Sequence, residues 1–255
     1  MEKRYTMARL SVNLNKVALL RNSRHTGSPN VVEFGRIALE AGAKGLTVHP
    51  RPDERHIRRT DVHDLAALLA PLRPAIEFNI EGRPTADFLD LVAEIRPEQV
   101  TLVPDAPQAF TSDSGWNLSA EGETLKPVVQ RLKQQGARVI LFMDPDAAQT
   151  PAVPATGADG FEIYTGAYAE AVRLHGLDSE AGQAALQAVV GAAQVGQRLG
   201  LMVNIGHDLD LLNTPPLIAG APFIHEASIG HELTGDALRY GFAEAVRRYG
   251  AALAV

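Results

Sequence analysis

Short apolar runs alternate along the chain with longer segments in which apolar residues recur at helical spacing. The short runs predict buried strands, and the longer amphipathic segments predict helices that cover them. Eight strands are predicted, at residues 10–14, 45–49, 75–80, 99–103, 137–143, 160–164, 201–205 and 223–227. The predicted helices between and after them are residues 31–41, 61–72, 84–95, 121–135, 147–155, 180–199, 213–219 and 237–252.

Regular alternation of strand and helix indicates a parallel sheet with helices packed outside it. Eight such units in 255 residues agree with the roughly 250 residues of a typical (β/α)8 TIM barrel. We therefore expect one α/β domain, residues 1–255, in which the sheet closes on itself. An open doubly wound sheet is the alternative, but residues 13–16 (NLNK) stand where its glycine-rich fingerprint is expected.

Polar residues stand at the ends of the predicted strands, and the carboxyl ends of barrel strands are where active sites lie. If the barrel is right, these side chains converge on one face. In chain order they are Asn13, Asn15 and Lys16; His49 and Arg51; Asn79 and Glu81; Asp105; Asp144; Glu162 and Tyr164; Asn204, His207 and Asp208; and His225 and Glu226, followed by Gly230 and His231.

Asn79 and Glu81 lie two residues apart on one predicted strand, so their side chains point to the same side of the sheet. In a closed barrel that side is the interior, where an unpaired carboxylate is costly. We therefore expect a shifted pKa at Glu81 and predict that it is a general base. A purely structural role is the alternative for any one of these polar residues.

Glycines and arginines near the strand ends favour phosphate ligands. Gly206 and Gly230 follow the last two strands, where barrels often bind phosphate through backbone N–H groups; ordinary turns are the alternative. Arginine matches phosphate oxygens, with surface solvation as the alternative. The candidates after the first two strands are Arg21, Arg24, Arg51 and Arg55, with His56 beside them. Residues 21–29 form a polar loop that we expect to close over substrates.

Composition narrows the classes of function. Hydrophobic residues make up 45% of the chain and charged residues 21%, as in globular domains, and the net charge of -6 argues against general nucleic-acid binding. The absence of cysteine excludes disulfides and thiolate chemistry. Because the first residues are charged and no apolar stretch approaches the roughly 20 residues of a membrane span, we expect a cytoplasmic protein.

Histidines near several strand ends raise the alternative of a metal site. They are His49, His56, His207, His225 and His231. No pair has the spacing of a helical zinc motif, and no cysteine accompanies them. A serine hydrolase is disfavoured because the Gly-x-Ser-x-Gly motif is absent.

At these positions the sequence resembles the pyridoxine 5'-phosphate synthase family, over nearly the whole chain. The order and spacing of the matching segments are specific, although no single segment is. They are residues 12–24 (VNLNKVALLRNSR), 45–57 (GLTVHPRPDERHI), 101–105 (TLVPD), 161–168 (FEIYTGAY), 203–207 (VNIGH) and 229–231 (IGH).

The resemblance implies a barrel with extra helices, assembly into octamers, and no redox cofactor or metal. It implies condensation of 3-amino-2-oxopropyl phosphate with 1-deoxy-D-xylulose 5-phosphate to give pyridoxine 5'-phosphate, inorganic phosphate and water. These two small molecules are then the partners, without nucleic acid or membrane. Such a reaction moves several protons, which requires several acid–base groups around one cavity.

Roles carry over from the family by matching position. His49 and Glu81 match the two proton acceptors, His207 the proton donor, and Glu162 a group that stabilises the transition state. The binders of the amino-ketone phosphate are matched by Asn13, Arg24, Gly230 and His231. The binders of the deoxyxylulose phosphate are matched by Arg51, His56 and Thr111.

Three positions depart from the family pattern. Asn15 and Lys16 stand where the family commonly has Asp-His, and Asp208 stands where it commonly has glycine. We keep all three as substrate-binding candidates, since each can still form hydrogen bonds. The departures leave the acid–base set intact but affect how substrate is bound.

Two other functions remain open. One is a different barrel enzyme on a phosphorylated sugar, such as an epimerase or a Schiff-base aldolase that uses Lys16, the lysine nearest a strand end. The other is a non-catalytic protein that binds phosphorylated ligands, which predicts binding without turnover.

Overall fold

The eight predicted strands form a closed parallel barrel. The computed structural model describes residues 7–106, 109 and 111–254. The strands are paired in the order β1 to β8, and β8 pairs with β1 to close the sheet, with Arg9 opposite Glu226. Their bounds are β1 Arg9–Asn13, β2 Gly45–Val48, β3 Glu77–Gly82, β4 Gln99–Leu102, β5 Arg138–Met143, β6 Gly160–Tyr164, β7 Met202–Gly206 and β8 Glu226–Ile229. The (β/α)8 prediction is therefore confirmed.

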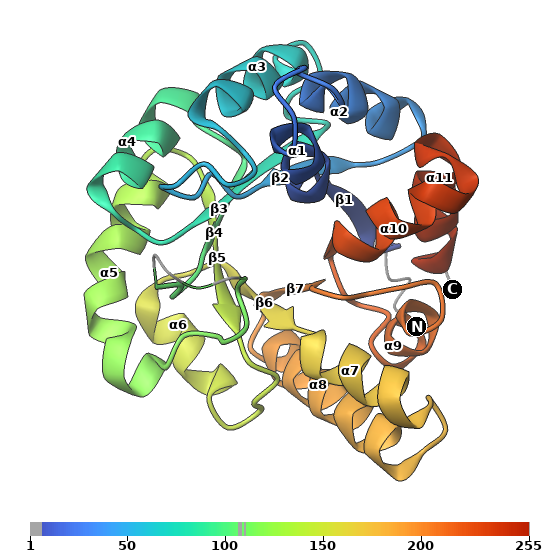
Figure 1. The fold of residues 1–255 in the computed structure, drawn as a ribbon. Coiled ribbons are helices and arrows are strands. Elements are labelled where there is room, and N and C mark those ends of the chain that lie inside the picture. Colours follow the sequence, from blue (N-terminus) through green and yellow to red (C-terminus); the bar gives the residue numbers. More distant parts are fainter. Residues whose placement is uncertain (1–6, 107–108, 110, 255) are drawn as a thin grey trace.

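Helices surround this barrel as an outer ring (Figure 1). Three of them, α1, α7 and α10, are additional to the one helix that each barrel unit needs, which agrees with the extra helices implied by the resemblance. The helix bounds are α1 Asn15–Asn22, α2 Val31–Glu40, α3 Arg59–Leu69, α4 Ala86–Ile95, α5 Leu118–Gln134, α6 Val153–Thr156 after the 3-10 turn Thr150–Ala152, α7 Gly166–His175, α8 Glu180–Arg198, α9 Thr214–Gly220, α10 His231–Tyr240 and α11 Phe242–Ala252.

Local side chains fix where several helices begin. Asn30 accepts a hydrogen bond from the Glu33 backbone N–H at 3.0 Å, and Ser179 accepts one from that of Gly182 at 2.9 Å. Such caps satisfy N–H groups that have no partner within the helix. These two helices begin within one residue of the predicted positions.

A helix, α1, follows β1 and includes the first two residues of the predicted polar loop 21–29, whereas residues 23–29 lie outside helices and strands. α1 is short and weakly amphipathic, and both Leu19 and Leu20 on it are exposed, so periodicity does not reveal it. Arg21 is buried, pairs with Asp61 and donates a 2.9 Å hydrogen bond to the carbonyl of His56. Arg21 is therefore a structural residue that joins α1 to the β2–α3 loop, and a lid cannot begin at this position.

The last strand lies three residues further along the chain than predicted. Residues 223–227 are the apolar run, but the paired strand is Glu226–Ile229. His225 and Glu226 are therefore at the amino end of the strand, and the prediction that they mark its carboxyl end is wrong. Similarly, the single predicted helix 237–252 is two helices, α10 and α11, separated by Gly241 with φ of 80°.

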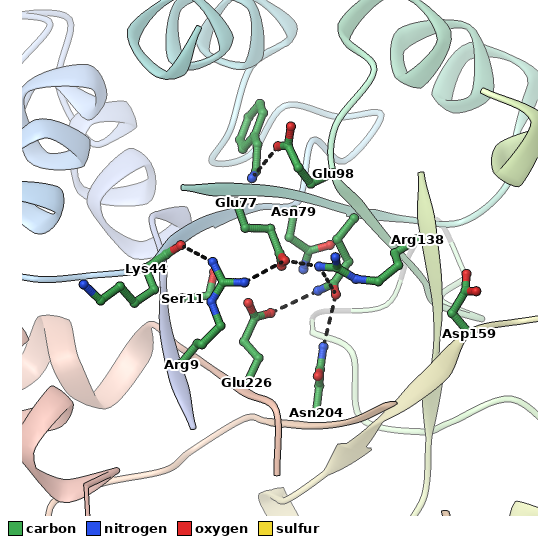
Figure 2. Close-up of polar contacts among 12 residues, drawn as sticks. Arg9, Ser11, Lys44, Glu77, Asn79, Glu98, Arg138, Asp159, Asn204 and Glu226 are labelled. Atoms are coloured by element: carbon green, nitrogen blue, oxygen red, sulfur yellow. Dashed lines mark hydrogen bonds and ion pairs between the residues drawn. The ribbon is translucent and has the colours of Figure 1, made fainter. Parts of the chain in front are cut away.

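The barrel interior is polar instead of being filled with branched apolar residues. Glu77 is 1% exposed and forms ion pairs with Arg9 and Arg138. Gln99 donates a 3.0 Å hydrogen bond to Glu226, and Asn204 donates one to Gln99. Figure 2 shows these side chains gathered inside the ring of strands. The apolar core instead lies between the sheet and the surrounding helices.

Candidate active site

A cavity of about 300 Å³ lies at the carboxyl ends of the strands. Every residue that the sequence predicts as catalytic or substrate-binding lines it, except Arg24 and the phosphate candidates Arg21 and Gly206. Arg24 is exposed in the loop after α1, and its predicted role is not supported by a place in this cavity. The predicted residues that line the cavity are Asn13, Asn15, Lys16, His49, Arg51, His56, Glu81, Thr111, Glu162, His207, Asp208, Gly230 and His231.

Glu81 and His49 form a buried acid–base pair in the site. Glu81 is the next-to-last residue of β3 and His49 directly follows β2, and the Oε2 and Nδ1 atoms are 4.0 Å apart. Asn13 donates a 3.4 Å hydrogen bond to the same carboxylate oxygen. Burial, together with the charge of Asp105, raises the pKa of Glu81 to about 7. At neutral pH this carboxyl group therefore exchanges a proton easily.

Burial lowers the pKa of His49 well below its ordinary value, and the charge of Arg51 adds to this effect. His56 behaves similarly, with a pKa of about 4 caused first by burial and then by Arg51. The His56 Nδ1 atom accepts a 2.9 Å hydrogen bond from the backbone N–H of Ile57, which leaves Nε2 as the N–H donor. Both histidines are therefore neutral at pH 7.

Glu162 lies on β6 opposite Asn204 of β7. Its side chain is 2% exposed, and its Oε2 atom has no hydrogen-bond partner among the described residues. Burial first, and then the charge of Glu81, raises the pKa of Glu162 well above its ordinary value. This shift favours the protonated form of the group, which can donate a hydrogen bond into the cavity.

The backbone at the end of β7 makes room for Glu162. A Cβ atom at Gly206 would lie 2.1 Å from the Glu162 Oε1 atom, so a side chain at this position would displace the Glu162 carboxylate. The sequence predicts a phosphate-binding turn at Gly206, but this glycine is the last residue of β7 and its requirement is steric. Gly230 does line the cavity and lies against Asn13, where a Cβ would be 3.0 Å from that residue.

His207 follows β7 with an unusual backbone. Its φ is 80° and that of Asp208 is 55°, a region that non-glycine residues enter rarely and often at functional sites. The Thr165 hydroxyl lies 2.5 Å from the carbonyl oxygens of both Gly206 and His207 and fixes this turn. Burial lowers the pKa of His207, and the charge of Asp208 opposes that shift.

Of the departures from the family pattern, Asn15 has a structural role through its side chain, whereas Asp208 has one only through its backbone. The Asn15 side chain accepts a 2.9 Å hydrogen bond from the backbone N–H of His49 and so helps to position it. The Asp208 carbonyl accepts a 3.1 Å hydrogen bond from the Asn213 side chain, which stabilises the turn. Lys16 lies in the first turn of α1, not on a strand.

Arg51 and Arg55 form the cationic side of the cavity. Arg51 is 5% exposed, pairs with Asp105 and donates a 3.1 Å hydrogen bond to the carbonyl of Ala109. Arg55 donates to the same carbonyl at 2.9 Å and pairs with Asp53. Guanidinium groups in this arrangement suit the phosphate of a substrate.

Sequence reasoning missed some residues that line the cavity. Those not predicted to touch substrate are Leu19, Ser112, Tyr164 and Ser228, whereas Arg55, a predicted phosphate candidate, does line the cavity. Tyr164 was visible as a polar residue at a strand end, whereas Ser228 was hidden by the error in the position of β8. Ser112 gives no signal in the sequence, because its place depends on the path of the β4–α5 loop.

The described residues contain no group of three or more His, Cys, Asp or Glu side chains that could hold a metal ion. Over the same ranges, none of the helices combines the length and apolar character that crossing a membrane requires.

The fold and this site together define a (β/α)8-barrel protein with buried acid–base groups and arginines around one cavity. The family model described as "Pyridoxal phosphate biosynthesis protein PdxJ" matches residues 10–254. The chain belongs to this family of pyridoxal phosphate biosynthesis proteins.

Two relatives extend this result, and both are named pyridoxine 5'-phosphate synthase. One, from Chelativorans sp. (strain BNC1), is 52% identical over 243 residues, which are 94% of this chain and 96% of that protein. The other, from Brucella suis (strain ATCC 23445 / NCTC 10510), is 51% identical over 247 residues, which are 97% and 99% of the two chains. The similarity therefore spans whole proteins.

Solved structures with much lower identity share the fold alone. Tryptophan synthase from M. tuberculosis superposes with a TM-score of 0.62 at 13% identity, covering 98% of this chain and 94% of that one. Phosphoribosyl anthranilate isomerase from Thermus thermophilus gives 0.56 at 15% identity, covering 96% and 98%.

Proposed function

We propose that this protein is a pyridoxine 5'-phosphate synthase. It condenses 3-amino-2-oxopropyl phosphate with 1-deoxy-D-xylulose 5-phosphate to form pyridoxine 5'-phosphate, inorganic phosphate and water. The observation that carries the proposal is one small cavity in which His49, Glu81, Glu162 and His207 meet, in a chain about half identical to proteins of that name. Ring formation from an amine and two carbonyl compounds needs such a set, because each step transfers a proton.

His49 and Glu81 are the proton acceptors in this proposal. The lowered pKa of His49 keeps its imidazole neutral at pH 7, so that it can accept a proton. The pKa of about 7 at Glu81 means that this group is partly ionised at the same pH. Because the two side chains are 4.0 Å apart, they can act on neighbouring atoms of one bound intermediate.

His207 and Glu162 act on the other side of the cavity. Glu162 is protonated and donates a hydrogen bond to the oxygen or nitrogen atom on which charge develops. His207 is neutral, and the negative charge of Asp208 favours its protonated form. His207 can therefore take up a proton in one step and deliver it to a leaving hydroxyl group in another.

The cationic side of the cavity holds the phosphates. Arg51, Arg55 and the Nε2–H of His56 line the cavity after β2 and are assigned to the deoxyxylulose phosphate, whereas Gly230 and His231 line it after β8 and are assigned to the amino-ketone phosphate. Two anchored phosphates bring the reacting atoms together and reduce the entropic cost of the bimolecular step. Arg24 stays a prediction, since it does not line the cavity.

The proposal is tested by incubating the purified protein with both phosphorylated substrates and a metal chelator, and by following pyridoxine 5'-phosphate by chromatography. Product is expected, and its absence from folded protein with verified substrates would overturn the proposal. The Lys16→Ala variant separates this reaction from a Schiff-base aldolase. It is expected to retain product formation, because Lys16 lies on α1 and no step requires it as a nucleophile.

The octameric assembly and the cytoplasmic location expected from the sequence stay predictions. Sedimentation of the purified protein measures the first, and fractionation of cells measures the second.

A further inference from the structure

Asp105 lies behind the active site, not in it. It follows β4, and its side chain is 6% exposed. It does not line the main cavity, but it lines a second cavity of about 430 Å³ that shares His49 and Arg51 with the first. Arg51 therefore stands in the wall between the two cavities, with Asp105 on the far side.

Asp105 is held firmly in this place. Its carboxylate pairs with the Arg51 guanidinium and accepts a 2.6 Å hydrogen bond from the Ser112 hydroxyl. Its backbone carbonyl accepts a 3.2 Å hydrogen bond from Arg83. Two contacts thus fix the carboxylate, and a third holds the backbone of the same residue.

Arg51 depends on this carboxylate for its orientation. Among the described residues, Asp105 is the only carboxylate within 4.0 Å of the Arg51 guanidinium. A cation that is 5% exposed is unstable without such a partner. The contact with Asp105 engages one terminal nitrogen of Arg51, and the 3.1 Å hydrogen bond to the Ala109 carbonyl engages the other. The remaining N–H groups of the guanidinium therefore point in a fixed direction.

The charges of this pair also act on Glu81. The groups around Glu81 are Asn13 from β1, His49 and Arg51 after β2, Asp105 after β4, and Glu162 on β6. After the effect of burial, the charge of Asp105 raises the pKa of Glu81, whereas the charge of Arg51 lowers it. Without the Asp105 charge, the pKa of Glu81 would therefore be lower.

We propose that Asp105 is a positioning residue of this active site, which holds Arg51 in the orientation that binds a substrate phosphate and offsets its charge beside Glu81. The inference rests on the proposed function, because it assigns Arg51 to the phosphate of 1-deoxy-D-xylulose 5-phosphate. Asp105 touches neither substrate, and its effect passes through Arg51.

The test is the Asp105→Asn variant, which keeps the shape of the side chain and removes its charge. The KM for 1-deoxy-D-xylulose 5-phosphate is expected to rise about tenfold, the effect of losing a hydrogen bond between charged groups. The acid limb of the pH profile of kcat/KM is expected to move to lower pH, because the pKa of Glu81 falls. A merely structural role for Asp105 would not move that limb.

Asp87→Asn is the matched control. Asp87 lines the same second cavity but is exposed and has no contact with Arg51 among the described residues, so this variant is expected to retain the KM and the pH profile of the unmodified protein. An unchanged KM and pH profile in folded Asp105→Asn would overturn the inference.

Two further measurements apply if Asp105→Asn does not fold or if the unmodified protein makes no product. If Asp105→Asn does not fold, Ser112→Ala, which removes one hydrogen bond to Asp105, is expected to raise the same KM about threefold, and an unchanged value would overturn the inference. If the unmodified protein makes no product, the proposed function fails. Calorimetric titration with 1-deoxy-D-xylulose 5-phosphate then still compares the affinity of this compound for the unmodified protein and for Asp105→Asn.

Discussion

Glu81 combines burial with a nearby negative charge, and both raise its pKa, to about 7. His49 beside it has a lowered pKa for the opposite reason, since burial penalises its cationic form. Both groups can therefore act as bases near neutrality, although a carboxyl group in water has a much lower pKa than a histidine. This matching of proton affinities is what a sequence of proton transfers at one site requires.

The pH dependence of the reaction follows from these values. We expect log kcat/KM to rise with pH along a limb centred near pH 7, because Glu81 must lose its proton to act as a base. His49 adds no limb above pH 6, since its pKa is lowered. Initial rates between pH 5 and 9 measure the limb, and phosphorus NMR of the substrates alone locates their own ionisation. A limb centred near pH 4.5 would show that Glu81 is not perturbed.

Much of the site could be predicted at the residue scale, because barrel topology converts positions after strands into positions in space. Glu81 and Asn79 were predicted to face inward from their spacing alone, and both are buried. Arg21 could not be assigned in this way. Its pairing with Asp61 depends on how α1 packs against α3, which is tertiary information that neither residue carries in its local sequence.

At the scale of the elements, β6 and β7 meet where the Gly206 backbone lies against the Glu162 carboxylate. A Cβ at Gly206 would lie 2.1 Å from the Glu162 carboxylate, so Gly206→Ala must displace either the strand or the acid. We expect a loss of about 1–3 kcal/mol in the free energy of unfolding and a large fall in kcat. Denaturant unfolding and the turnover assay measure the two effects.

Gly191→Ala is the control for that change. Gly191 is in α8, and a Cβ there would meet nothing within 4 Å. In a helix interior alanine is favoured over glycine by roughly 0.8–1 kcal/mol, so this variant is expected to be stabilised with unchanged turnover. A Gly206→Ala protein as stable and active as the unmodified one would contradict the close contact.

The elements themselves were predictable where burial and periodicity agree. The strands from β1 to β7 are near their predicted places because each contains closely spaced, buried apolar residues. β8 is displaced because its paired residues, Glu226–Ile229, include two polar side chains that face a polar interior, whereas the apolar run lies before them. α7 was missed because it is a short addition between β6 and the long helix α8.

For the whole molecule, the polar barrel interior makes stability depend on pH. Burial first, and then the charge of Glu77, raises the pKa of Glu226 well above 4.5. The folded protein therefore keeps a proton that the unfolded chain releases above about pH 4.5. The free energy of unfolding accordingly falls as pH rises, until Glu226 ionises in the folded state as well.

Glu226→Gln removes this penalty. Its amide can donate to the Glu77 carboxylate, which has one unpartnered oxygen among the described residues, and still accept from Gln99. We expect Tm at pH 8 to rise by about 2–4 °C, the shift that about 1 kcal/mol gives in a chain of this size, and the rise to shrink at pH 4.5. Glu123→Gln, at an exposed site, serves as the control and should show no such pH-dependent difference. A lower Tm for Glu226→Gln at pH 8 would refute the protonated state of Glu226.

The central claim is that the buried acid–base groups of one cavity carry out the condensation, with Glu81 as a required base. The most direct test compares pyridoxine 5'-phosphate formation by the unmodified protein and by Glu81→Gln, with both substrates saturating at pH 7. We expect product from the first and a kcat lower by about 10²–10⁴ in the second, with no loss of Tm because the neutral amide suits the buried site. Equal rates in the two proteins would show that Glu81 is not a required base.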